Sequence, residues 1–233
     1  VEHNLVGLRW ATDAQRALVT PALAPLPTIT SHARGAIFLG EIPRDPWIAE
    51  TRWRDETETT TDPARFRQNA ALKGRTHKLF LKGDLTDHGQ ALVATLQDSA
   101  VEVVAVVFNA IDDQIGSSNT GAKLQVHANA IAGFIPSIRA ALAGQRRIIV
   151  TADHGHSPFW GKSLRVGEGA SARYRELGAS EQAPAGFIEI DVDRLGGKRG
   201  RMAFAWKMGA YQGGPQVGFH GGCSLEEMVV PLA

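Results

Sequence analysis

Side chains that can bind a metal ion follow two predicted strands and lie in one glycine-rich turn. Asp153 and His154 follow the β-branched residues 148–150 after two residues, and Asp112 and Asp113 follow the mainly β-branched residues 101–108. His220 lies within Gly-Phe-His-Gly-Gly, where glycines allow backbone to approach a ligand closely. Carboxylates and imidazoles are ligands for zinc or manganese in hydrolases. These residues therefore predict a divalent metal site.

Hydroxyl groups that could act as a nucleophile cluster at Thr28, Thr30 and Ser31, before the apolar residues Ile37 and Phe38. This order predicts a helix that begins at Thr30 or Ser31 and ends at Gly40. A metal ion can lower the pKa of a hydroxyl, and the start of a helix favours phosphate oxygens. Thr30 could instead serve only as the N-cap of this helix.

The elements that must position these groups alternate between strand and helix. Such alternation predicts right-handed βαβ units and a mostly parallel sheet, with ligands bound beyond the carboxyl ends of its strands. A helix is expected to be kinked at Pro136, and Ser224 and Glu227 form a capping-box pattern. We expect strands at 78–82, 101–108, 147–151, 187–192 and 202–206, and helices at 88–99 and 121–144. Residues 5–10 form a short apolar opening that could be the end of a strand, and residues 229–232 form a short apolar segment. A surface excursion is expected at 44–63 and a long loop at 158–185.

Composition indicates one ordinary globular domain. The chain has 233 residues, of which 43% are hydrophobic and 21% charged, and no linker divides it. A net charge of +1 provides no global basic field for nucleic acid. The single cysteine, Cys223, excludes an internal disulfide framework and fits a reducing, cytoplasmic location. We expect no membrane span and no signal peptide, and the start at Val1 suggests a processed or excised piece.

Five segments in series resemble the alkaline phosphatase superfamily, and within it the PglZ proteins of BREX phage-defence systems. Pro-Thr-Ile-Thr-Ser-His-Ala-Arg-Gly resembles the nucleophile turn and its helix, and Val-Thr-Ala-Asp-His-Gly resembles a metal-ligand segment. The resemblance implies an α/β fold with a central, mostly parallel sheet sandwiched between helices. It also implies that residues 1–233 form a single domain of a larger protein. The matching segments are 27–43, 78–87, 106–113, 150–155 and 219–231.

The resemblance also implies roles for individual residues. Thr30 would attack phosphorus and coordinate one metal ion, which Asp153 and His154 would also hold. Asp112, or its neighbour Asp113, would join His220 at a second ion or complete a shared site. Zinc is favoured and manganese is the alternative. The implied reaction is hydrolysis of a phosphoester, a diester rather than a monoester, through a phosphothreonine.

Partners follow from the same resemblance: a phosphoester substrate such as a nucleotide or nucleic acid, and other BREX proteins, including a DNA methyltransferase. No membrane partner is expected. A sulfatase relative is disfavoured because sulfatases use a nucleophile derived from Cys or Ser. A phosphomutase relative is disfavoured because it would use Ser and a larger cap than residues 44–75 provide.

Two departures from the superfamily support a different hypothesis, a scaffold that binds metal or partner proteins without turnover. Val6 stands where the superfamily has a metal-binding Asp, and Gly116 stands where many members have a His.

Structural alternatives also remain for the individual residues. Asp112 and Asp113 could lie in a solvated loop, Asp153 and His154 could be structural, and His220 could be a turn residue. For His156, a loop role or support of a ligand is favoured over direct coordination, and His127 is expected on a helix surface.

Overall fold

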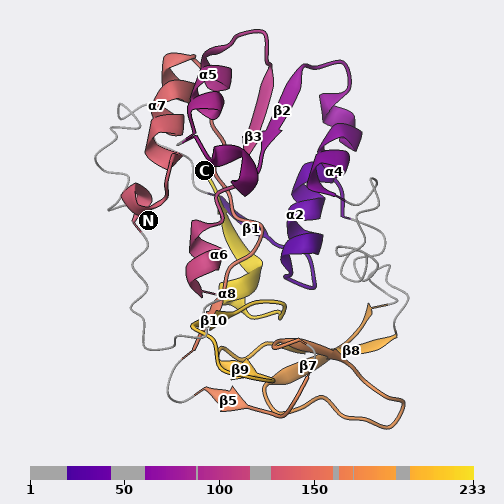
Figure 1. Cartoon of the computed structure of the whole chain (residues 1–233). Coiled ribbons are helices and arrows are strands. Elements are labelled where there is room, and N and C mark those ends of the chain that lie inside the picture. The colour runs from indigo at the N-terminus through magenta and orange to yellow at the C-terminus, as the bar shows by residue number, and fades with distance from the viewer. Residues whose placement is uncertain are drawn as a thin grey trace.

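The computed structural model describes residues 20–42, 61–87, 89–115, 127–159, 163–169, 171–192 and 200–233. In Figure 1 these residues form a helical half around strands β2 and β3 and a second half of short strands. The described residues do not include the apolar segment at 5–10, most of the surface excursion at 44–63, or positions Val6 and Gly116.

A parallel strand pair forms the centre of the helical half. β2 (His77–Phe80) pairs with β3 (Val103–Val106), and His77 lies opposite Val103. Val104 and Val106 contact a core with helices α5 (Gln90–Gln97) and α7 (Phe134–Ala143) on one face of the pair. Val103 and Ala105 pack on the other face against Phe38 of α2 (Thr30–Leu39) and Phe66 of α4 (Asp62–Gln68). Alternation of side chains along a strand explains why helices cover both faces (Figure 1).

Helices α2 and α4 contact each other through a glycine. Gly35 leaves room for Arg65 of α4, whose Nη1 donates to the carbonyl oxygen of Ser31 at 2.5 Å. α2 ends as predicted at Gly40, which has φ 79°. α4 begins after Thr61, whose hydroxyl accepts a hydrogen bond from the backbone N–H of Ala64 at 3.3 Å.

The C-terminus adds antiparallel pairing at the middle of the molecule. β1 (Thr20–Leu23) pairs with β11 (Val229–Leu232), and Thr151 bridges Leu232 from the other side. Before β11 lies the short helix α8 (Leu225–Met228), whose predicted capping box between Ser224 and Glu227 is confirmed.

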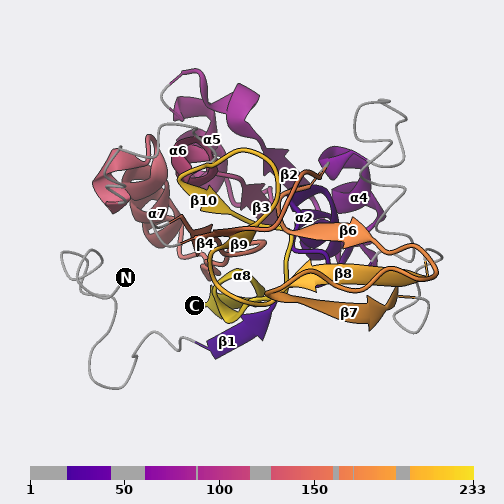
Figure 2. The same ribbon diagram turned by 90° about the horizontal axis from the view of Figure 1, so that it is seen from below.

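Short strands form the second half. The three-stranded antiparallel sheet has the order β6-β8-β7 (Figure 2). β4 pairs with β10 antiparallel, and β5 pairs with β9 parallel. The strands are β4 (Ser157–Pro158), β5 (Leu164–Arg165), β6 (Tyr174–Glu176), β7 (Phe187–Asp191), β8 (Arg201–Ala205), β9 (Ala210–Tyr211) and β10 (Gly218–Phe219).

The expected α/β class is present, but the described residues do not form a large central parallel sheet. Within the described ranges the parallel pairs are β2 with β3 and β5 with β9. Residues 147–151 were expected as a buried parallel strand, and this was wrong. Val150 exchanges backbone hydrogen bonds with Ala233 at 2.9 and 3.0 Å, and Ile149 is 69% exposed. A β-branched run predicts extended backbone without deciding its pairing partner.

Three further expectations need correction. Pro136 lies in the first turn of α7, where proline is tolerated, so it does not kink a longer helix. His127 precedes the short 3-10 helix at Ala128–Ala130 and does not lie on α7. Residues 158–185 include β5 and β6 and are not one continuous loop. The remaining short helices are α6 (Ala110–Ile115) and 3-10 turns at Ala70–Leu72 and Lys82–Leu85.

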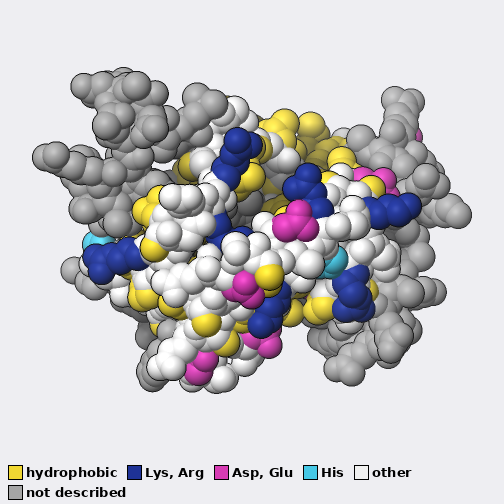
Figure 3. Space-filling model, turned by 90° about the horizontal axis from the view of Figure 1, so that it is seen from above, with side chains coloured by type: hydrophobic (Ala, Val, Ile, Leu, Met, Phe, Trp, Pro, Cys, Tyr) yellow, Lys and Arg dark blue, Asp and Glu magenta, His cyan; other side chains and the backbone are white. Residues whose placement is uncertain are grey.

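Surface charge agrees with the small net charge of the chain. On the face seen in Figure 3, basic side chains lie in separate groups among neutral and apolar ones. Among the described helices, none combines the length and apolar character needed to cross a membrane.

Candidate metal centre

The pairing of β4 with β10 brings two histidines together from distant parts of the chain. His156 directly precedes β4 and His220 directly follows β10, and antiparallel pairing places these positions side by side. Their ring centroids are 5.2 Å apart. Ile115 of α6 packs closely against Gly218 of β10. A Cβ at Gly218 would lie 2.5 Å from the Cγ2 atom of Ile115.

A close backbone contact fixes His154 between its neighbours. The N–H of Gly155 donates to the carbonyl oxygen of Glu227 at 2.8 Å. A Cβ at Gly155 would lie 2.0 Å from the carbonyl oxygen of Glu226, so this approach to α8 requires glycine. His154 is 3% exposed and stacks on His220, with ring centroids 4.2 Å apart and planes 7° apart.

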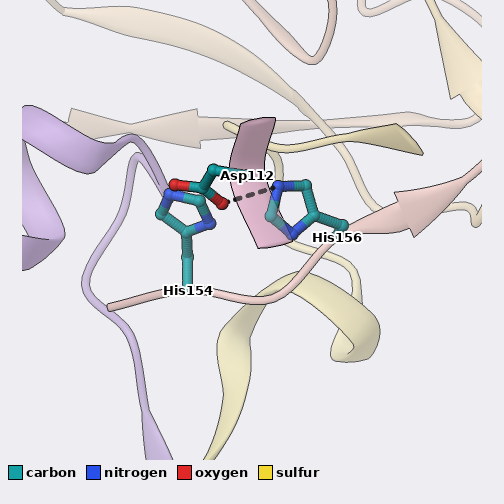
Figure 4. A group of neighbouring side chains, drawn as sticks. All are labelled: Asp112, His154 and His156. Atoms are coloured by element: carbon teal, nitrogen blue, oxygen red, sulfur yellow. Dashed lines mark ion pairs between the residues drawn. The ribbon is translucent and has the colours of Figure 1, made fainter. Parts of the chain in front are cut away.

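Asp112 enters the cluster from the first turn of α6. Its Oδ1 atom lies 3.3 Å from Nε2 of His156 (Figure 4). Asp112, His154 and His156 each offer one ligand atom, and these three atoms lie within 4.8 Å of one another. The structure therefore adds His156, for which the sequence favoured only a loop or supporting role. Its signal in the sequence was the position two residues after His154.

The Thr30 hydroxyl faces the same cluster. Its Oγ1 lies 3.1 Å from Nε2 of His154. The N-cap of α2 is Ile29, and Thr30 is the first helical residue. The interpretation of Thr30 as an N-cap is therefore wrong.

Asp113 and Asp153 differ in their distance from the histidines. Asp113 points away from the histidines and forms an ion pair with Lys82 at 2.7 Å, where both side chains are more than half exposed. Asp153 lies at the edge of the cluster. Its Oδ1 accepts a hydrogen bond from the backbone N–H of His154 at 3.1 Å, and its Oδ2 lies 3.8 Å from Nε2 of that ring.

Comparison with protein families identifies the family of the chain. The family model described as the BREX system PglZ alkaline phosphatase-like domain matches residues 12–233. The chain belongs to the PglZ family. A search of curated proteins found no match. Membership places the chain in a BREX-associated family of phosphoesterase-like domains with an α/β fold.

The donor set of this PglZ domain fits a divalent metal ion. Nδ1 of His154 lies 3.1 Å from the carbonyl oxygen of Gly155, and Nδ1 of His220 lies 3.0 Å from that of Thr28. A carbonyl oxygen only accepts, so each Nδ1 bears the proton and each Nε2 keeps a lone pair. Histidine ligands typically use this arrangement.

Burial also favours the neutral forms of His156 and His220, and the neutral imidazole is the form that binds metals. Burial lowers the pKa of His156 to about 3, with further lowering by His220 and His154. Burial, and then the proximity of His154, lowers the pKa of His220. Burial raises the pKa of Asp112, and the interaction with the His154 ring opposes this rise. A bound cation would compensate for the cost of a buried carboxylate.

Arg34 is a further residue near the site that the sequence analysis did not select. It lies one helical turn after Thr30 on α2, and its Nε is 2.8 Å from Oδ2 of the buried Asp62. The positive charge of Arg34 favours the ionised form of Asp112. Spacing of four residues on a predicted helix was the signal that could have identified it.

Proposed function

We propose that this PglZ domain is a metal-dependent phosphoester hydrolase with Thr30 as its nucleophile. The supporting observation is the 3.1 Å distance between the Thr30 hydroxyl oxygen and Nε2 of His154, one of the three clustered donors. A nucleophile beside ligands of a divalent metal is the arrangement expected for metal-assisted phosphoryl transfer.

The metal would be held by Asp112, His154 and His156, with Asp153 and His220 completing this site or holding a second ion. Zinc is favoured because two or three imidazoles and a carboxylate suit it, and manganese is the alternative. When bound, the metal supplies positive charge that lowers the pKa of a nearby hydroxyl and stabilises charge on the phosphoryl oxygens.

The residues of the chain orient and separate the reacting groups. Thr30 is at the start of the ten-residue helix α2, whose first N–H groups point toward the side from which a phosphate would bind. The Thr30 oxygen attacks phosphorus and the ester alcohol leaves with a proton. Water then hydrolyses the phosphothreonine, which releases the phosphoryl product and restores the hydroxyl.

The substrate class and partners follow from the family. We favour a phosphodiester, such as a nucleotide or nucleic acid, over a monoester. The association with BREX makes other proteins of that system, including a DNA methyltransferase, the expected partners in the cytoplasm. Two metal ions and one shared ion both remain compatible with the proposal.

A scaffold without turnover is the second candidate. The sequence favours it through Val6 and Gly116, which stand where the superfamily has a metal-binding Asp and, in many members, a His. Such a domain would bind metal or another BREX protein without hydrolysing a substrate.

Hydrolysis of bis-p-nitrophenyl phosphate with zinc or manganese tests the proposal. We expect metal-dependent activity in the unaltered chain, partial activity in Thr30→Ser and background activity in Thr30→Ala. Thr86→Ala is the matched control because Thr86 is exposed in a turn. Equal activity in Thr30→Ala would exclude Thr30 as the nucleophile. Metal binding without activity in any variant would support the scaffold.

A further inference from the structure

Thr28 connects the beginning of α2 to the loop that holds His220. Its hydroxyl donates to the carbonyl oxygen of Gly222 at 2.8 Å and accepts from the N–H of Gly221 at 2.9 Å. Its own carbonyl oxygen lies 3.0 Å from Nδ1 of His220. Thr28 is fully buried, so these contacts replace hydrogen bonds to water.

The loop offers Thr28 backbone groups because side chains do not fit there. Gly221 has φ 111°, and a Cβ at this position would lie 3.0 Å from the ring of Tyr174. A Cβ at Gly222 would lie 2.5 Å from the carbonyl oxygen of Ala205. From the opposite side, the N–H of Gly222 donates to Oε1 of Glu227 at 2.9 Å. Thr28 and Glu227 thus hold the loop between them.

We propose that Thr28 is a positioning residue that fixes the tautomer of His220 and links it to the position of Thr30. The carbonyl of Thr28 keeps the proton on Nδ1, so Nε2 of His220 keeps its lone pair. The hydroxyl keeps the loop against that carbonyl. Thr28 precedes Thr30 by two residues, so the same short segment determines the positions of the ligand His220 and the nucleophile Thr30. The consequence for metal binding rests on the proposed function.

A measurement on the metal-free chain tests the tautomer directly. Long-range ¹H–¹⁵N spectra distinguish Nδ1–H from Nε2–H imidazoles, and His220→Gln identifies the His220 signals. We expect the Nδ1–H form in the unaltered chain and in Thr28→Ser, which keeps a hydroxyl. Thr28→Val keeps the shape and loses both hydroxyl bonds, so we expect a mixture of tautomers. An unchanged tautomer in Thr28→Val would overturn the proposal.

The matched control is Thr95→Val. Thr95 is also buried, but its hydroxyl donates to the carbonyl oxygen of Ala91 within α5 at 2.8 Å. It therefore reports the general effect of removing a buried hydroxyl. We expect Thr95→Val to leave the His220 signals unchanged. A tautomer mixture in this control equal to that in Thr28→Val would contradict a specific role for Thr28.

Zinc affinity, measured by competition with a fluorescent chelator, tests the coupling. We expect Thr28→Val to weaken zinc binding about tenfold, as loss of a partner behind a ligand typically does. In a His220→Ala background the same substitution should have no further effect. An equal tenfold loss in that background would show that Thr28 does not act through His220. Failure of the unaltered chain to bind zinc would overturn the proposed function, and the tautomer result would still decide the role of Thr28.

Discussion

Asp112 and Asp113 show how one residue along a helix changes the environment of a carboxylate. Successive side chains on a helix point about 100° apart. Asp112 therefore faces Nε2 of His156 at 3.3 Å, whereas Asp113 reaches Lys82 at 2.7 Å. The sequence left open which of the two would bind metal, and the geometry favours Asp112.

Asparagine at each position tests this choice. We expect Asp112→Asn to weaken zinc binding by about tenfold or more, because it removes a charged ligand of the proposed site. Asp113→Asn is the matched control, and it should bind zinc like the unaltered chain. Zinc titration against a chelator measures both. The opposite order of effects would require a different orientation of α6.

Cys223 provides a prediction of pH dependence. Burial, and next the negative charge of Glu227, raises the pKa of the Cys223 thiol to about 11 from an ordinary value of 9.0. Because the thiolate is the reactive form, alkylation by iodoacetamide should become tenfold faster per pH unit from pH 7 to 10 without levelling off. The chain unfolded in urea is the control, and its rate should level off near pH 9. A plateau near pH 9 in the folded chain would contradict the raised pKa.

The raised pKa of Cys223 also determines how the free energy of unfolding changes with pH. The folded state binds the thiol proton more tightly than the unfolded state does. The resulting stabilisation is complete below about pH 9 and is lost as the pH rises toward 11.

At the scale of elements, the sequence predicted those that local patterns define. Gly40 ends α2 as expected, and the predicted strands at 187–192 and 202–206 correspond to β7 (Phe187–Asp191) and β8 (Arg201–Ala205). β4 and β10 could not be predicted, because two residues each are too few to show a period of two. Their pairing places His156 beside His220, so the sequence identified individual donors without their arrangement.

Gly35 is an element-scale feature with a testable cost. Glycine inside a helix is normally less stable than alanine by about 1 kcal/mol. A Cβ at Gly35, however, would lie 1.9 Å from Nη1 of Arg65, which is buried and bonded to Ser31. We therefore expect Gly35→Ala to lower the free energy of unfolding by about 1–3 kcal/mol, measured in urea.

Two variants control for this steric effect. Gly83→Ala should change the free energy of unfolding little, because nothing lies within 4 Å of its added Cβ. In an Arg65→Ala background, Gly35→Ala should cost much less, because the obstructing guanidinium is absent. A stabilising effect of Gly35→Ala in the unaltered chain would show that α2 and α4 pack less closely.

At the scale of the whole molecule, the site depends on contacts between distant segments. Thr28, Asp112, His154 and His220 come from four segments, and the loops at 152–156 and 220–224 contact both halves of the molecule. Local propensity cannot specify such contacts, because they depend on tertiary packing of backbone groups. The sequence likewise gave no sign that residues 147–151 would pair with the C-terminus.

The buried ion pair of Arg173 and Glu227 links the small sheets to the C-terminal helix. Nη2 of Arg173 lies 2.5 Å from Oε2 of Glu227, and both side chains are fully buried. Arg173→Met would leave a buried carboxylate without its partner, so we expect a loss of about 3–5 kcal/mol in the free energy of unfolding. Adding Glu227→Gln to Arg173→Met should cost less than the sum of the two single changes. Lys82→Met, which breaks an exposed pair, is the control and should cost less than about 1 kcal/mol. Urea unfolding compares the four variants, and equal losses in Arg173→Met and Lys82→Met would show that the buried pair contributes no more to stability than the exposed one.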